Sequence, residues 1–147
     1  MSEHDLPLKL IELARRDLRA AEILRDQPEV GDGIVGFHAQ QAAEKALKAW
    51  LTILGIDFPR THDLSLLIQK LSGAGVEVLA LWDLLDLNPF AVQLRYEILE
   101  GESFDHASSL EQVAALLDGV EMLLAAPGAG PETPGEPEKP EGSGTGA

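Results

Sequence analysis

Apolar residues recur at helical spacing along most of the chain, and this pattern predicts five helical segments. A first helix is expected over about Leu6–Asp26 and a second from about Gly33 or Ile34 to Leu54. Two shorter segments follow at about His62–Leu71 and Val76–Leu87, and the last covers about Leu110–Ala125. The connections are short, which favours antiparallel neighbours. The pattern therefore predicts an all-α fold, an up-and-down antiparallel bundle of about five helices.

Capping residues and helix breakers mark the expected ends of these segments. Asp5 is the predicted N-cap of the first helix, and Gly55 closes the second. Thr61 is the expected cap of the third. Ser109, with a glutamine three residues later, has the spacing of a capping box at the start of the last helix. The fourth segment is expected to end before Asn88-Pro89, because proline disfavours helical geometry in the residue that precedes it.

Two stretches of the sequence allow more than one interpretation. The stretch "VEVLAL", residues 76–81, alternates as a strand would, but helical spacing continues through "LWDLLDL" and no partner strand is expected, so we favour a helix. The stretch "FAVQLRYEILEGESFDHA", residues 90–107, is expected to begin as a helix and then to loop around Gly101.

The second helix carries an apolar arc of about 200°, which is wider than the stripe of about 100° that suffices for a surface helix. The arc comprises Ala39, Ala42, Ala43, Ala46, Leu47, Ala49, Trp50, Ile53 and Leu54. One neighbour cannot cover such an arc. The helix is therefore expected at the centre, packed on two sides or at a subunit interface.

Two polar side chains fall on the predicted apolar faces. Gln40 lies inside the arc of the second helix, where a buried amide needs hydrogen-bond partners. Asp17 falls in the middle of the apolar face of the first helix, where a carboxylate is costly unless it is paired. It either bonds a buried polar group or faces a cleft. Its candidate partners are Gln40, Lys45, His62 and Arg95.

The remaining arc of the second helix, about 120° wide, is polar. It holds His38, Gln41, Glu44, Lys45, Lys48 and Thr52. Glu44 and Lys48 have the favourable i, i+4 order, worth a few tenths of a kcal/mol. The arc fits a solvated face with helix-stabilising pairs, and it also fits one side of a binding site.

Two further short motifs could bind an anion. His62 and Asp63 stand at the start of the third helix, where free N–H groups can hold an anion, although an acidic residue there also serves as a cap. Arg95 could form a fork on a phosphate or carboxylate, and Tyr96 could stack on a base. A surface or interface pair is the alternative for Arg95 and Tyr96.

Composition divides the chain into a folded domain at residues 1–126 and a tail at residues 127–147. The tail, "PGAGPETPGEPEKPEGSGTGA", is rich in proline, glycine and glutamate and cannot bury enough surface to order, so we predict that it is disordered. The net charge is −14, which argues against a general nucleic-acid binder and leaves only a local basic cluster for any phosphate.

The chain offers few signals for other classes of site. It has no cysteine, no metal-ligand spacing among its histidines and no glycine-rich phosphate loop with the required flanks. We therefore expect no metal and no other cofactor. The polar N-terminus and the lack of a long apolar run predict a cytoplasmic protein without a membrane segment.

Four motifs, taken in order, resemble the HEPN domain (higher eukaryotes and prokaryotes nucleotide-binding domain). "ARRDLRAAEIL" resembles the first helix of the family, and "FHAQQAAEKALKAWL" closely resembles its central helix. "THDLSLLI" matches the next helix start, and "RYE" falls where the family often has Arg-Tyr. The resemblance spans about residues 6–125.

The resemblance implies a bundle of about five helices that usually forms a homodimer. The family includes nucleotide-binding modules, partners of small nucleotidyltransferases and RNase toxins of toxin–antitoxin pairs. By this resemblance, a nucleotide or similar anion would be bound, and the residues expected to line its cleft are Lys45, Lys48, His62, Arg95 and Tyr96. His38 and Lys45 are the members of the polar arc of the second helix that are expected to face a ligand.

The resemblance also suggests an enzymatic alternative. RNase members carry Arg, four to six residues, and then His, whereas here Arg95 and His106 have ten residues between them and Arg60 and His62 are too close. The chain departs from that motif, so a non-enzymatic module is favoured over a metal-independent RNase that would use Arg95 with His106 or His62. A purely interacting module, in which polar residues fix the register of a dimer, is the third interpretation.

Overall fold

A computed structural model describes residues 5–91 and 105–126, and these residues are helical throughout most of their length. Two long helices, α1 (Asp5–Leu24) and α2 (Asp32–Ile53), are joined through a short 3-10 turn, η1 (Pro28–Val30). The helix α3 (Leu64–Gly73), the 3-10 helix η2 (Leu79–Ala91) and α5 (His106–Ala125) follow. No strand occurs within these described ranges. The predicted all-α bundle is confirmed.

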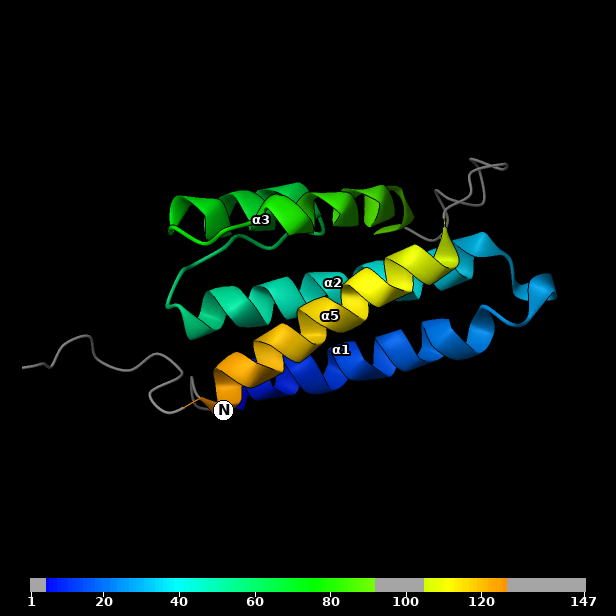
Figure 1. The fold of residues 1–147 in the computed structure, drawn as a ribbon, viewed down its shortest axis with the longest axis horizontal. Coiled ribbons are helices and arrows are strands. Elements are labelled where there is room, and N and C mark those ends of the chain that lie inside the picture. Colours follow the sequence, from blue (N-terminus) through cyan, green and yellow to red (C-terminus); the bar gives the residue numbers. More distant parts are fainter. Residues whose placement is uncertain (1–4, 92–104, 127–147) are drawn as a thin grey trace, which may run out of the picture.

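The helix α2 lies at the centre of the bundle. It contacts α1, α3, η2 and α5. Figure 1 shows α5 crossing over α1 and α2, with α3 and η2 on the other side of α2. Nearly all of its predicted apolar arc is buried, whereas Leu54 is exposed and Trp50 is half-buried. The wide arc is therefore covered within one chain.

Ion pairs connect the first helix to the last. Arg15 of α1 donates to both carboxylate oxygens of Glu121, at 3.0 and 2.6 Å, and to Asp118 at 2.6 Å. The hydrogen bond from Arg15 lowers the pKa of the Glu121 carboxyl below its ordinary value. These contacts fix the rotation of α5 on α1.

The buried face of α1 differs from the predicted one. Its fully covered positions are Ile11, Ala14, Leu18 and Ala21, whereas Leu10 and Leu13 are only partly buried. The face is therefore turned by about a quarter of a helical turn from the arc that placed Asp17 at its centre. Asp17 lies at the edge of the contact with α2, with its side chain 17% exposed. The predicted face comprised Leu10, Leu13, Ala14, Ala21 and Leu24, with Ile11 and Leu18 at its edge. Its rotation was wrong because the leucines at 10, 13 and 24 weighted it, whereas the large side chains that are buried with the two alanines are Ile11 and Leu18.

The third helix begins two residues later than predicted, and its cap is Asp63 in place of Thr61. The Asp63 carboxylate accepts from the backbone N–H of Ser65 at 2.9 Å and from the Ser65 hydroxyl at 2.7 Å. The side chain of Asn88 also donates to Asp63, at 3.0 Å. The capping interpretation of Asp63 is thus confirmed. The hydrogen bonds from Asn88 and Ser65 hold the pKa of the Asp63 carboxyl below its ordinary value.

The fourth segment is a 3-10 helix that continues through Asn88 and Pro89, so the predicted end before them was wrong. The carbonyl oxygen of the Asn88 side chain accepts from the backbone N–H of Leu64 at 3.0 Å, which fastens η2 to the start of α3. Phe90 is buried beside Gly36 of α2. These tertiary contacts hold the chain past the proline.

The last helix begins at His106, four residues before the predicted start. Its N-cap is Asp105, whose carboxylate accepts from the backbone N–H of Ser108 at 3.1 Å. The predicted cap, Ser109, is buried inside the helix. The two predictions for the tail at 127–147 and for the loop around Gly101 lie outside the described residues.

Candidate functional site

A row of hydrogen-bonded polar side chains, here called the polar seam, lies along α2. Most members come from α2 itself, at spacings that bring them to one side of the helix, while one comes from α1 and one from the connection to α3. The members are Asp17, His38, Gln40, Gln41, Glu44, Lys45, Lys48 and His62.

Asp17 forms the α1 end of the seam. Its carboxylate accepts from Nζ of Lys45 at 2.6 Å and lies 3.0 Å from Nδ1 of His38. A carboxylate only accepts hydrogen bonds, so Nδ1 of His38 carries the proton that points to Asp17. Lys45 was among the partners expected for Asp17, and His38 was not. The side chains of Asp17 and Lys45 are 17% and 22% exposed, so this pair is largely shielded from solvent.

Glu44 forms the other end of the seam and is buried, with 4% of the residue exposed. Of the two interpretations of the polar arc, the solvated face therefore does not hold for Glu44. Its carboxylate accepts hydrogen bonds from Gln40, Gln41, Lys48 and His62. Burial opposes ionisation of Glu44, but the hydrogen bonds and charges of Lys48 and His62 prevail and lower its pKa below the ordinary value.

The two glutamines join these ends into one network. Gln40 is fully buried and donates to the backbone carbonyl of His62 at 3.0 Å and to Glu44 at 3.3 Å. Gln41 donates to the side-chain oxygen of Gln40 at 2.8 Å and accepts from Lys45 at 3.2 Å. A continuous chain of hydrogen bonds therefore links α1 to the connection between α2 and α3.

The predicted ligand residues have different environments. Lys45 and Lys48 each contact a carboxylate, and Lys48 also lies 5.9 Å from the ring centre of Phe58. The His62 side chain is 64% exposed, with Nδ1 held by Glu44 at 2.9 Å. Arg95 and Tyr96 lie outside the described residues. The structure thus brings three of the five predicted residues into one row.

Charges within the seam balance. The two lysines offset Asp17 and Glu44, so the row supplies a phosphate with no cationic excess from its lysines and carboxylates. His106, considered with Arg95 for RNase chemistry, lies 2.7 Å from Asp32 of α2 through its Nε2. In the residues that the structure describes, no group of three or more potential metal ligands is found.

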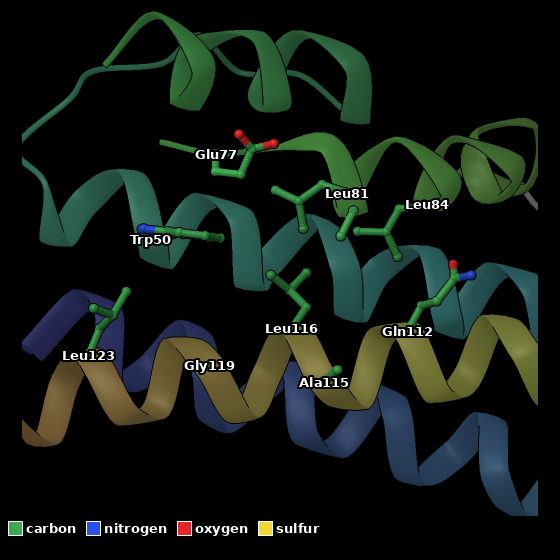
Figure 2. A pocket seen from close by; sticks show the side chains of 10 residues that line it. Trp50, Glu77, Leu81, Leu84, Gln112, Ala115, Leu116, Gly119 and Leu123 are labelled. Atoms are coloured by element: carbon green, nitrogen blue, oxygen red, sulfur yellow. The ribbon is translucent and has the colours of Figure 1, made fainter. Parts of the chain in front are cut away.

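A groove on another side of the molecule lies between η2 and α5, with α2 beneath it (Figure 2). Its volume is about 530 Å³. Apolar and small side chains dominate its surface, with one acid and one amide among them. The lining residues are Trp50, Glu77, Ala80, Leu81, Leu84, Gln112, Ala115, Leu116, Gly119 and Leu123.

Comparison with known families decides the affiliation of the chain. The sequence profile of the HEPN domain matches residues 8–126. The protein belongs to the HEPN family. Comparison with curated proteins and with solved structures gave no significant match. The matched range includes the whole polar seam and the groove, so both belong to the HEPN domain.

Sequence reasoning missed several contacts of this HEPN domain. Glu44 stands four residues after Gln40, a spacing that would have signalled a shared environment once Gln40 was placed inside. The groove wall on α5 carries Ala115 and Gly119, small residues one turn apart on the side that faces η2. The pairing of Asp32 with His106 joins residues 74 positions apart and left no local signal.

None of the HEPN helices in the described part of the chain combines the length and apolar character that crossing a membrane requires.

Proposed function

We propose that this HEPN protein is a homodimeric, non-enzymatic interaction module of the cytoplasm that works beside a nucleotidyltransferase-type partner. The observation that carries this form of the proposal is the internal pairing of the seam. Lys45 and Lys48, the cations expected to meet a nucleotide, already neutralise Asp17 and Glu44. Side chains that pair with one another inside the protein position its helices. Polar networks at the core of assemblies serve the same role and fix how the parts align.

The surface of α1 supports the dimer. Leu8 and Ile23 are exposed to 58% and 49% and lie on one side of the helix at about 100° per residue, although large apolar side chains favour burial. A second copy covering this surface would remove these side chains from water. Membership of the HEPN family adds to this argument, because the resemblance of the chain to that family implies a homodimer.

Nucleotide binding is the second candidate function, and the single row formed by Lys45, Lys48 and His62 favours it. Calorimetric titration of the full chain with ATP and with GTP separates the two candidates. The interaction module predicts no saturable heat. Saturable heat that Lys45→Ala abolishes, in a variant that is still folded, would favour the nucleotide site.

The partner itself can be tested by co-expression. A suitable probe is any small protein that is encoded beside this chain and carries the Gly-Ser and paired-Asp motif of nucleotidyltransferases. We expect the two proteins to elute as one complex from a sizing column. Separate elution would contradict the partner proposal, and cleavage of a mixed RNA pool that Arg95→Ala abolishes would replace it with the RNase alternative.

A further inference from the structure

The groove between η2 and α5 is lined mainly by apolar side chains from both elements. Leu81 and Leu84 face it from η2, Leu116 and Leu123 face it from α5, and Trp50 lies at one end (Figure 2). The lining runs along α5 from Gln112 to Leu123, which at 1.5 Å per residue is about 16 Å, or three helical turns. A groove of this length matches the apolar stripe of one short helix.

Acidic side chains border the groove on both walls. In a 3-10 helix residues three apart eclipse, so exposed Asp83 lies directly beyond Ala80 on the edge of η2, and Glu77 itself lines the groove. On α5, exposed Glu111 stands one turn before the lining residue Ala115. Within the described residues, neither Asp83 nor Glu111 has an ion-pair partner.

Positive charge is missing from both walls. Neither η2 (Leu79–Ala91) nor α5 (His106–Ala125) contains a lysine or an arginine. Among the acids on and next to these elements, Asp118 and Glu121 pair with Arg15. Glu77 accepts from the backbone N–H of Leu79. Within the described residues, Asp83 and Glu111 have no ion pair and are therefore left for a ligand. An apolar floor between acidic edges is complementary to an apolar stripe between basic edges.

We propose that the groove binds a basic amphipathic helix of a partner protein, with apolar side chains spaced over about three turns and lysine or arginine on both flanks. This inference rests on the proposed function as an interaction module, and it gives the chemistry of the partner segment. Helices bind apolar grooves in this way through anchors at i, i+3 or i+4, and i+7. By pairing with Asp83 and Glu111, the basic flanks speed the association of the helix with the groove and fix its orientation there.

A second copy of the chain is a poorer occupant. A two-fold dimer through the groove would bring η2 and α5 of both copies together, and all four walls carry acids without a basic residue. Like charges brought together at an interface oppose association. The groove is therefore assigned to a partner of opposite charge, and the contact between two copies of the chain is assigned to another surface.

Gly119 allows a clean test of the groove. A Cβ built at this glycine has no atom within 4 Å, so a larger side chain enters the groove without a clash inside the protein. Gly119→Leu is the blocking variant. Gly73→Leu is the matched control, because Gly73 lies at the end of α3, outside the groove, with the same open space around its Cβ.

The probe is a fluorescein-labelled helical peptide of about 18 residues, above the length at which isolated helices are marginal, with a leucine stripe flanked by lysines. Anisotropy titrations with the full chain should give saturable binding that Gly119→Leu weakens about tenfold or more and Gly73→Leu leaves unchanged. Asp83→Asn with Glu111→Gln should weaken it several-fold and reduce its salt dependence. The control for charge is Asp26→Asn with Asp57→Asn, at exposed sites outside the groove lining.

Three results would overturn the inference: binding that survives Gly119→Leu, equal binding of a peptide with glutamates in place of lysines, or equal binding of a scrambled peptide that keeps the lysines. Light scattering on the same variants separates this failure from failure of the proposed function. A dimer that persists without peptide binding removes only the groove assignment. A dimer that Gly119→Leu dissociates would give the groove to a second copy.

Discussion

At the scale of single residues, the pair of Lys45 and Asp17 is expected to stabilise the contact between α1 and α2. Lys45→Met leaves a largely buried carboxylate with His38 as its one remaining partner among the described residues, so we expect a loss of about 1–2 kcal/mol in the free energy of unfolding. A double-mutant cycle with Asp17→Asn, measured by urea unfolding, should give a coupling energy clearly above error.

The matched control for this pair is Lys9 with Glu12, whose side chains are 49% and 57% exposed at a distance of 3.3 Å. Solvent screens such a pair, so Lys9→Met should change the unfolding free energy by less than about 0.5 kcal/mol. Equal effects at Lys9 and Lys45 would show that the seam has no special role in holding α1.

Glu44 should make the stability of the protein depend on pH in acid. Its folded-state pKa is held below the ordinary 4.5, so the unfolded chain takes up the proton first. The stabilisation is complete above the ordinary value and is lost as the pH falls through the folded pKa. Urea unfolding from pH 7 down to pH 3 should therefore show decreasing stability below about pH 4.5.

Glu44→Gln tests the origin of that loss. The amide of glutamine replaces one carboxylate oxygen with an N–H group, which cannot accept the hydrogen bond that Lys48 or His62 donates to Glu44. The variant should therefore be less stable at pH 7 by about 1–3 kcal/mol. It should also lose less stability than the parent on acidification. A residual decrease is expected from Asp63 and Glu121, whose pKa values are lowered too. Identical acid slopes in the two proteins would contradict the assignment to Glu44.

At the scale of elements, two glycines should respond to the same substitution in opposite directions. A Cβ at Gly36 would lie 2.5 Å from ring atoms of Phe90, so Gly36→Ala must displace the buried ring that fastens η2 to α2. We expect a loss of about 1–3 kcal/mol from overpacking, which exceeds the gain in helix propensity.

Gly119→Ala has only the gain in helix propensity, because its Cβ meets no atom within 4 Å. We expect it to raise the free energy of unfolding by about 0.5–1 kcal/mol. Thermal and urea unfolding of Gly36→Ala and Gly119→Ala, compared with the parent protein, measures both changes in the free energy of unfolding. A stabilising Gly36→Ala would show that Phe90 does not pack against α2 as described.

The helices differ in how much of them could be predicted from the sequence. The period of the apolar residues predicted each segment and the central position of α2, because burial of an apolar arc dominates the placement of a helix. Helix starts were less predictable. Asp63 and Asp105 cap α3 and α5 in place of nearby Thr61 and Ser109, since the choice among neighbouring cap residues depends on tertiary contacts such as that of Asn88 with Asp63.

The candidate site was only partly predictable for the same reason. The sequence indicated that Gln40 is buried and named Lys45 as one of four candidate partners for Asp17, because each polar side chain on an apolar face needs a partner. The four-residue spacing of Glu44 from Gln40 was a signal of a shared environment, but the partner that His62 supplies to Glu44 depends on the connection to α3 and left no local signal. Nor could the sequence reveal the groove, whose two walls come together only in the folded chain.

At the scale of the whole molecule, the tail at residues 127–147 is expected to add charge without adding stability. It carries four glutamates and one lysine, a net of −3 of the total −14. A chain that ends at residue 126 should keep the helical signal in circular dichroism and its unfolding free energy to within about 0.5 kcal/mol. A larger loss would place part of the tail in the folded domain.

We propose that this HEPN protein acts as a homodimeric interaction module. Light scattering on the full chain as it elutes from a sizing column tests that claim most directly. We expect a mass of twice the 15.8 kDa of one chain, unchanged when ATP or GTP is added. A single-chain mass at every concentration, or a dimer that forms only with nucleotide, would contradict it.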